Sequence, residues 1–288
     1  MKRRDALLAL QASILVALLG CATPAPQRSA APLNIASYNL RLNLASDGPN
    51  AWPQRRAAVQ ALLRYHEVDI VGTQEGLIEQ IEDLEAMGDY ARVGVGRDDG
   101  ARGGEHSAIF FRKSRFEALR HGDFWLSETP DRPSLGWDAR CCKRLASWVE
   151  LRDRQQAARS FYVFSVHFDH EGEVARRESA RLLLQRIAQI AGSAPVFALG
   201  DFNSTPETAQ IRLMQASLRD AYLASETAPY GPVGTFNDFR IDAPMRERID
   251  YIFVSPGIRV LKYGVLSDSL AGRFPSDHHP VLVRASLD

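Results

Sequence analysis

The sequence predicts a single α/β domain preceded by an export segment. Three observations support this prediction: short apolar runs bounded by polar residues, amphipathic stretches between those runs, and no internal repeat or linker after residue 32. Alternation of strand-like and helix-like segments is typical of layered α/β folds. A chain of 288 residues with 45% hydrophobic content can bury a large core without disulfides to staple it.

The strands are predicted from the apolar runs. Each run is short, and its composition of Val, Ile, Leu, Phe and Tyr between polar boundaries is that of buried strands. The runs occupy residues 33–42, 68–75, 107–112, 161–168, 195–203, 248–255 and 279–287.

Three stretches between the runs are predicted to be helices. Residues 52–66 place Pro53 in a first helical turn and repeat apolar side chains at helical spacing. Residues 173–191 show the same spacing, and residues 208–218 show it over a shorter length. The remaining Gly-, Pro- and charge-rich stretches, residues 97–106 and 126–144, are expected to be long surface loops, which often carry function.

The first 32 residues are expected to lie outside the domain, which covers residues 33–288. Residues 1–20 join a basic start to an apolar stretch too short to span a membrane, which is typical of a signal peptide. The letters "LLGC" resemble a bacterial lipobox, so we expect lipidation of Cys21 and a flexible tether over residues 21–32. A plain secreted protein is the alternative. We therefore expect an exported lipoprotein, anchored in a membrane at the periplasm or cell surface.

Charge and cysteine content argue against two other classes. Lys+Arg and Asp+Glu are both 35, whereas a general nucleic-acid binder needs a basic excess for its phosphate contacts. Three cysteines form no disulfide framework. Cys141 and Cys142 are neighbours, and because a bridge between adjacent residues needs a strained ring, we interpret both as ordinary thiols.

Polar side chains recur at the ends or edges of the apolar runs. Each has an ordinary explanation as a turn or cap, but repetition over many strands predicts one shared site. Carboxylates and an amide without cysteine favour Mg²⁺ or Mn²⁺, and Mg²⁺ typically works on phosphate. The site composition therefore predicts metal-assisted phosphoester hydrolysis. The residues are Asn39, Glu75, His167, Asp169, Asp201, Asn203, Asp250, Asp277 and His278.

Six motifs, in order, resemble the endonuclease/exonuclease/phosphatase (DNase I-like) superfamily. They are "SYN", "QE", "VHFDH", "GDFN", "RIDYIF" and "SDHHPV", and the resemblance covers nearly all of residues 33–288. The phrases "GDFWLSETP", "GWDA" and "GPVGTF" look like a bacterial branch near the CCR4-like members. The resemblance implies a four-layer αββα sandwich, in which two packed mixed β-sheets are flanked by helices.

The resemblance also implies a metal centre and the groups around it. Glu75 is the expected main ligand of Mg²⁺, with Asn39 and Asp277 at the same site. Asp201 would orient the attacking water or assist the leaving group, and Asn203 would hold a phosphate oxygen.

The resemblance further implies roles for three residues that handle the phosphate. His278 would contact it or transfer a proton, Asp250 would orient His278, and His167 would steady the phosphate from the other side. His279, which follows directly, is expected to be dispensable. The residues expected to shape the substrate pocket are Asp169, Arg176 and, unless it serves only packing, Trp137.

The leading interpretation is a Mg²⁺-dependent phosphodiesterase or phosphatase at the cell envelope. Its substrate would be a phosphorylated small molecule, a lipid headgroup or a short nucleic acid. The first alternative is a nuclease, either an endonuclease or a 3′–5′ exonuclease on DNA or RNA. A non-catalytic binding lipoprotein is a third reading, which the complete set of site residues disfavours. We expect the protein to be a monomer.

Overall fold

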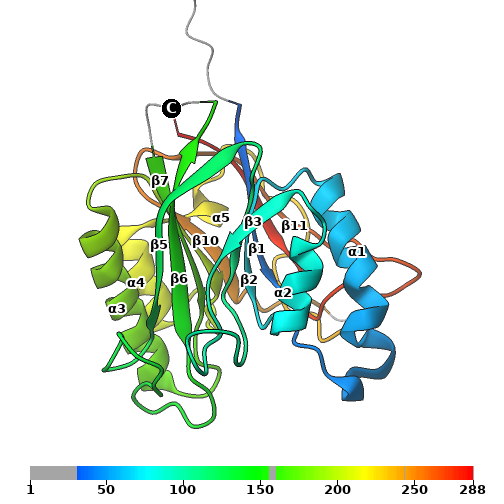
Figure 1. The fold of residues 1–288 in the computed structure, drawn as a ribbon. Coiled ribbons are helices and arrows are strands. Elements are labelled where there is room, and N and C mark those ends of the chain that lie inside the picture. Colours follow the sequence, from blue (N-terminus) through cyan, green and yellow to red (C-terminus); the bar gives the residue numbers. More distant parts are fainter. Residues whose placement is uncertain (1–30, 156–159, 243, 288) are drawn as a thin grey trace, which may run out of the picture.

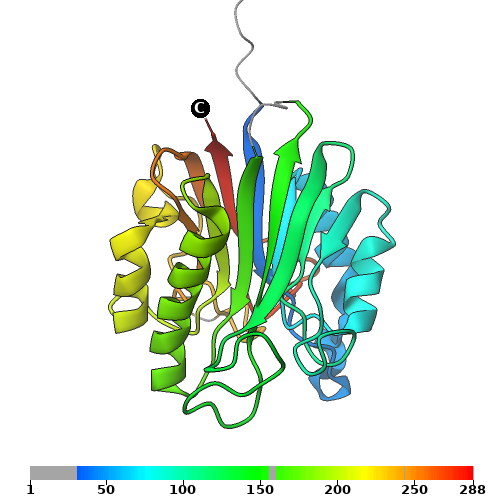
Figure 2. The same cartoon turned by 60° about the vertical axis from the view of Figure 1, so that its left-hand side comes forward.

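Two six-stranded sheets pack face to face, and helices cover their outer faces (Figures 1 and 2). The computed structural model describes residues 31–155, 160–242 and 244–287. Within them, the αββα sandwich expected from the motifs is confirmed. The predicted signal peptide, Cys21 and most of the tether lie outside the described residues. No helix in the described part of the chain is both long and apolar enough to cross a membrane.

The first sheet has the strand order β11-β12-β1-β2-β4-β3. It is mixed, because β1 pairs in parallel with β2 and antiparallel with β12. Helices α1 and α2 cover its outer face (Figure 1). The bounds are β1 Leu33–Asn39, α1 Trp52–Tyr65, β2 Ile70–Gln74, α2 Ile78–Glu85, β3 Tyr90–Val93, β4 Ile109–Arg112, β11 Arg259–Val265 and β12 Val281–Ser286, with a short 3-10 helix at Ala45–Asn50.

The second sheet has the order β5-β6-β7-β8-β10-β9, with α3 and α4 on its outer face (Figures 1 and 2). It is also mixed, because β8 pairs in parallel with β7 and antiparallel with β10. The bounds are β5 Phe116–Trp125, β6 Leu145–Asp153, β7 Ser160–His167, α3 Glu173–Ala191, β8 Val196–Asp201, α4 Ala209–Ser217, β9 Arg219–Asp220, α5 Ala221–Ala224 and β10 Asp250–Val254.

The two sheets approach each other closely at Gly72 of β2. A Cβ atom at this position would lie 2.1 Å from Cδ1 of Leu199 in β8 and 2.9 Å from Oγ of Ser165 in β7. Fully buried side chains from both sheets, such as Ile70 and Val163, share this core. Only glycine leaves room for the opposite sheet here, so the residue helps to set the spacing of the layers.

A buried arginine joins the sheets at the end where β1 begins. The guanidinium of Arg115 donates to Asp69, just before β2, and to Asp153, at the end of β6, with both distances at 2.9 Å. It also donates to the backbone oxygens of Ala31 and Pro32. Because both carboxylates and several acceptors meet one cation, this buried charge is fully compensated. The polar strand ends lie at the opposite end of the sandwich.

Candidate active site

The strand directions bring the polar side chains together at one edge. The carboxyl ends of β1, β2, β7 and β8 meet there, and β10 begins there because it runs antiparallel to β8. In register, Asp201 lies beside both His167 and Asp250. Glu75 and Asn203, which follow strand ends, have φ values of 62° and 45°. Positive φ is uncommon for residues with a Cβ atom and concentrates at functional sites.

Asn39 holds two carboxylates together at the centre of the site. Its Nδ2 donates to Oε1 of Glu75 at 2.9 Å and to Oδ2 of Asp201 at 3.0 Å. Its Oδ1 accepts the backbone N–H of Arg41, so the amide oxygen is turned away from the carboxylates. The second oxygen of Glu75 accepts the backbone N–H of Leu42 at 3.1 Å. In this arrangement the amide nitrogen of Asn39 holds the two carboxylates, and its oxygen faces the backbone of Arg41.

The centre has the chemistry of a divalent-cation site. One ligand atom each from Glu75, Asp201 and His278 lie within 4.8 Å of one another. Burial and the Asp250 carboxylate raise the pKa of Asp201 to about 7. Burial, and then the charge of Glu75, also raise the pKa of Asp277. The raised pKa values mean that the surroundings disfavour the negative charge of both carboxylates. A divalent cation would compensate this charge, and hard cations prefer oxygen ligands.

Asp277 lies in the same cavity but outside this compact group. Its Oδ2 is 3.8 Å from Nη1 of Arg41, and its Oδ1 accepts from the hydroxyl of Ser276 at 3.3 Å. Of the three predicted metal residues, Glu75 belongs to this compact group, Asn39 donates a hydrogen bond to Glu75, and Asp277 lines the same cavity.

His278 is held as a cation by Asp250. Its Nδ1 lies 2.9 Å from Oδ2 of Asp250, which leaves Nε2 toward the site, 3.8 Å from Oδ2 of Asp201. Burial opposes the charge on His278, but the Asp250 carboxylate outweighs burial and raises the pKa well above its usual value. An oriented imidazolium can bind a phosphate oxygen or give a proton to a leaving group.

His167 flanks Asp201 in the opposite protonation state. Its Nε2 is 3.6 Å from Oδ2 of Asp201, and its Nδ1 is 3.7 Å from Oε2 of Glu105. Burial and the adjacent Arg144 guanidinium lower the pKa of His167 well below its usual value. Asp201 thus lies between a neutral and a charged imidazole, and such divergent environments commonly separate acid and base roles.

A cavity of about 430 Å³ opens over this edge. Six of the predicted site residues line it: Glu75, His167, Asp201, Asn203, Asp277 and His278. Asn39 and Asp250 lie behind this wall, where Asn39 binds Glu75 and Asp201 and Asp250 binds His278. The volume is that of a site for a small molecule.

The three residues predicted to shape the pocket lie outside the cavity lining. Asp169 is buried behind it, where its Oδ1 accepts the backbone N–H of Gly172 at 2.6 Å. Arg176 donates to the backbone oxygen of Asp169 at 3.2 Å. The backbone N–H of Trp137 donates to Glu128, and its side chain is half-buried in the loop. Asp169 and Arg176 support the wall at a distance, whereas Trp137 stays within its loop.

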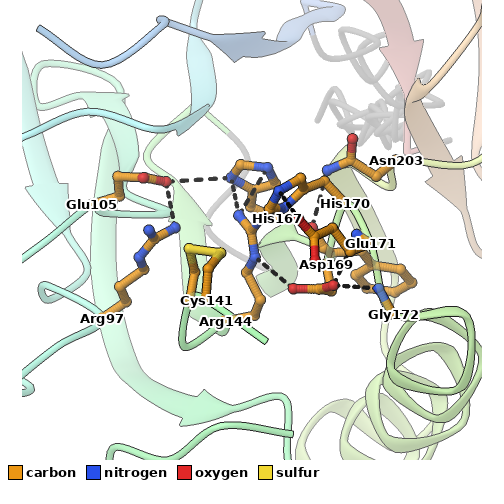
Figure 3. Close-up of a disulfide and its surroundings, with 12 residues drawn as sticks. Arg97, Glu105, Cys141, Arg144, His167, Asp169, His170, Glu171, Gly172 and Asn203 are labelled. Carbon is orange, nitrogen blue, oxygen red and sulfur yellow. Dashed lines mark hydrogen bonds and ion pairs between the residues drawn. A yellow bond between two sulfur atoms is a disulfide. The ribbon is translucent and has the colours of Figure 1, made fainter. Parts of the chain in front are cut away.

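Several charged or titratable residues of the cavity lining were not among the predicted site residues, namely Arg41, Arg97, Glu105, Arg144, His170, Asp238 and Glu247. Arg97 pairs with Glu105 at 2.5 Å, and Arg144 lies between the rings of His167 and His170 (Figure 3). Arg97, Glu105 and Arg144 belong to the two stretches that the sequence predicted as functional loops. No spacing or motif marked them individually within those loops.

Cys141 and Cys142 form a disulfide, with their Cα atoms 3.7 Å apart (Figure 3). The expectation of two ordinary thiols is therefore wrong. The loop around them, residues 136–144 and here called the cysteine loop, is fixed on both sides of the pair. Asp138 accepts two backbone N–H groups of α3, and Lys143 donates to the backbone oxygen of Asp98. Because its ends are held, the loop can keep neighbouring sulfur atoms in bonding contact.

Solved structures resemble the whole of this fold. An endonuclease/exonuclease/phosphatase family protein from Bacteroides thetaiotaomicron is 41% identical, with a TM-score of 0.85 over 90% of this chain and 98% of that chain. The mannosyl-6-phosphatase Bt3783 from Bacteroides thetaiotaomicron VPI-5482 is also 41% identical, with a TM-score of 0.83 over 88% and 99%.

A curated relative matches part of the chain. It is the uncharacterized protein L388 of Acanthamoeba polyphaga mimivirus, 26% identical over 169 residues, which span 53% of this chain and 59% of that protein. The family model described as "Endonuclease/Exonuclease/phosphatase family" matches residues 36–278. That match takes in the strand-end residues from Asn39 to His278 that form the acidic centre. This chain belongs to the endonuclease/exonuclease/phosphatase family of phosphoester hydrolases.

Proposed function

We propose that this protein is a divalent-metal-dependent hydrolase that releases phosphate from a sugar phosphate at the cell envelope. The observation that carries the proposal is the meeting of Glu75, Asp201 and His278 on the wall of a small cavity. Hydrolysis of a phosphate ester needs charge neutralisation, a positioned water and a proton donor around phosphorus. These residue types can meet all three needs.

The residues divide the chemistry between them. Asp201, in its ionised form, orients the attacking water and accepts its proton, while the imidazolium of His278 binds a phosphate oxygen or protonates the leaving oxygen. Asp250 keeps His278 charged and oriented. Glu75 and Asp201 would hold the divalent cation, Mg²⁺ or Mn²⁺, which when bound neutralises phosphate charge.

Two observations favour a sugar phosphate as the substrate class. One is the 41% identity to a structure named as a mannosyl-6-phosphatase. The other is the pair of exposed carboxylates, Asp238 and Glu247, that lines the cavity. Carboxylates accept hydrogen bonds from hydroxyl groups and repel the phosphates of a nucleic-acid strand.

A nuclease for short single strands is the second candidate. It is favoured by the three arginines in the cavity lining, Arg41, Arg97 and Arg144, and by the aromatic ring of Phe236. Cationic grooves with aromatic side chains suit single-stranded nucleic acid. Against it, each of these guanidiniums lies within 4 Å of a carboxylate of the protein.

Export and lipid anchoring through Cys21 remain part of the proposal, as does a monomeric state. The disulfide supports export, because disulfides persist in oxidising compartments outside the cytoplasm. Anchoring is tested by labelling cells with a fatty acid: the label should be incorporated into the wild-type chain and lost in Cys21→Ser.

Activity is tested by incubating the purified protein with mannose 6-phosphate, other sugar phosphates and oligonucleotides, each with Mg²⁺ or with EDTA. We expect phosphate release from a sugar phosphate that EDTA abolishes and added Mg²⁺ restores. Glu75→Ala should be inactive. Cleavage of oligonucleotides without release from sugar phosphates would select the nuclease, and no hydrolysis of any substrate would select a binding role.

A further inference from the structure

The cysteine loop is a rigid part of the cavity wall. On one side, Asp138 accepts the backbone N–H groups of Val174 and Ala175 at 3.1 and 2.7 Å, at the start of α3. On the other side, Nζ of Lys143 donates to the backbone oxygen of Asp98 at 2.7 Å. The loop therefore joins the second sheet's helix layer to the glycine-rich loop at residues 97–106.

The disulfide lies where this loop meets the cavity. Cys142 is half-buried and lines the cavity, while Cys141 is exposed beside it. Among the described residues that line the cavity, the few without a charged or strongly polar side chain are Leu42, Cys142, Phe236 and Ile249. A disulfide has no N–H or O–H to satisfy, and its sulfur atoms are polarisable. It thus adds apolar surface to a wall that is otherwise mostly ionic.

A sugar phosphate presents two kinds of surface to such a wall. Its ring carries C–H groups that pack on apolar surface, and its hydroxyl groups need acceptors. The carboxylates of Asp238 and Glu247 can accept those hydroxyl groups, whereas the acidic centre at Glu75 takes the phosphate end. The disulfide, which lies in the same wall, is suited to the C–H groups.

We propose that the Cys141–Cys142 disulfide contacts the sugar ring of the substrate and sets the preference of the enzyme for that leaving group. This inference rests on the proposed function of the site. Closing the two side chains into one ring removes the rotation that two free thiols would have, so the contact surface is preorganised before the substrate arrives.

The disulfide could instead act only by holding Arg144, which is two residues further on. Arg144 is buried, and its Nη1 lies 3.0 Å from Nε2 of His167. A disturbed Arg144 would weaken the phosphate end of the site for every ligand. A lost contact with the sugar would weaken only ligands that carry a sugar, so two probes distinguish these roles.

The test measures dissociation constants by calorimetry in the presence of Mg²⁺ for two probes. One probe is inorganic phosphate, and the other is a non-hydrolysable phosphonate analogue of mannose 6-phosphate. The double variant Cys141→Ser/Cys142→Ser should bind the phosphonate more weakly, by on the order of tenfold, and bind inorganic phosphate as the wild type does. Arg140→Ala, exposed in the same loop and outside the cavity lining, is the matched control and should resemble the wild type.

Two further measurements keep the outcome unambiguous. Wild-type protein treated with a phosphine reductant retains both sulfur atoms but loses the ring, and it should show the same selective weakening if the double variant folds poorly. In steady-state hydrolysis of mannose 6-phosphate, KM should rise while kcat stays within about twofold, as expected for loss of a uniform binding contact.

The inference is overturned if the two probes weaken equally, if neither weakens, or if the wild type binds the phosphonate no better than inorganic phosphate. A different outcome would contradict the proposed function. A wild type that binds the phosphonate selectively through the disulfide, yet hydrolyses only oligonucleotides, would contradict hydrolysis of sugar phosphates and leave the contact standing.

Discussion

Two adjacent histidines, His278 and His279, have opposite surroundings. His278 points to Asp250 and Asp201 in the active site. The ring of His279 packs edge-on against Phe274, with centroids 4.7 Å apart, and its Nε2 lies 3.0 Å from the sulfur of Met245. His279 is buried and lies outside the cavity lining. It is therefore a packing residue, which refines the expectation that it is dispensable.

Substitution of each histidine should separate chemistry from stability. We expect His278→Ala to lower kcat by on the order of 10³-fold, because it removes the imidazolium that donates a proton and carries positive charge beside the phosphate. His279→Ala should retain kcat but lower the free energy of unfolding by about 2 kcal/mol, since it removes a buried ring. Steady-state kinetics and urea titration measure the two effects. An equal loss of kcat in both variants would mean that both imidazoles take part in the reaction.

Because His279 is buried, its protonation should lower the stability of the folded protein at acidic pH. Burial lowers the pKa of His279 to about 4, below the usual value of about 6.5 that it regains on unfolding. The unfolded chain then binds more protons between these values, so stability is retained above pH 6.5 and falls toward pH 4. The difference between the two pKa values of His279 corresponds to about 3 kcal/mol of unfolding free energy.

His279→Gln removes this titration, so the difference in unfolding free energy between pH 7 and pH 4.5 should be smaller in the variant than in the wild type. Urea titrations at the two pH values measure it. Parallel pH profiles for the two proteins would contradict the assignment.

Metal binding should release protons from Asp201. In the metal-free protein the pKa of Asp201 is raised to about 7, so part of the molecules carry this proton at pH 7. Binding a divalent cation requires the ionised carboxylate and therefore releases a fraction of a proton per ion at this pH. Calorimetric titration with Mg²⁺ in buffers of different ionisation enthalpy measures the release. It should disappear in Asp201→Asn and shrink above pH 8, and a pH-independent value would contradict the assignment.

At the scale of elements, the sequence predicted interior strands and missed edge strands. The seven apolar runs correspond to β1, β2, β4, β7, β8, β10 and β12, and the three amphipathic stretches correspond to α1, α3 and α4. Four of the five unpredicted strands, β3, β5, β9 and β11, lie at the sheet edges. An edge strand buries less side-chain surface and so carries a weaker apolar pattern, as the exposed middle of β5 at Leu119 illustrates.

The same contrast applies to the active site. Residues at strand ends, such as Glu75 and Asp201, were predictable because parallel strands bring their carboxyl ends to one edge of a sheet. Arg97 and Arg144 were not, since their positions depend on loop contacts such as the bond between Lys143 and the backbone of Asp98. The disulfide depends on the same contacts, and sequence adjacency alone argued against it.

A contact from the cysteine loop also caps the N-terminus of α3. The N-cap residue of α3, Gly172, has no side chain to accept the first N–H groups, and Asp138 accepts two of them from the cysteine loop instead. Asp138→Ala should lower the free energy of unfolding by about 1 kcal/mol, as loss of a helix cap does. Urea titration measures this cost. Asp131→Ala removes an exposed ion pair with Arg186 and serves as the control, with an expected cost of a few tenths of a kcal/mol at most. Equal costs would show that Asp138 does not act as a cap.

For the molecule as a whole, the spacing of the two sheets should depend on Gly72. Gly72→Ala would place a methyl group against Leu199 of the facing sheet, so we expect a loss of about 1–3 kcal/mol in unfolding free energy. Gly264, in β11, is the matched control, because an added Cβ would meet its nearest neighbour, Tyr230, at an ordinary 3.6 Å. Gly264→Ala should be nearly neutral in the same denaturant titration. A neutral Gly72→Ala would mean that the layers can separate without cost.

The antiparallel pairing of β1 and β12 places the start of β1 and the end of β12 at the same end of the molecule. Leu33 pairs with Ala285, so the first and last described residues lie at one end of the fold (Figures 1 and 2). The Arg115 cluster lies near this end, and the cavity lies at the other end of these strands. Seven residues of strand separate the two ends by about 20 Å. If residues before Ala31 hold the protein to a membrane, the attachment point is at the end of the domain away from the cavity. An attachment there would leave the mouth of the cavity uncovered by the tether, so that substrate could enter it from the surrounding medium.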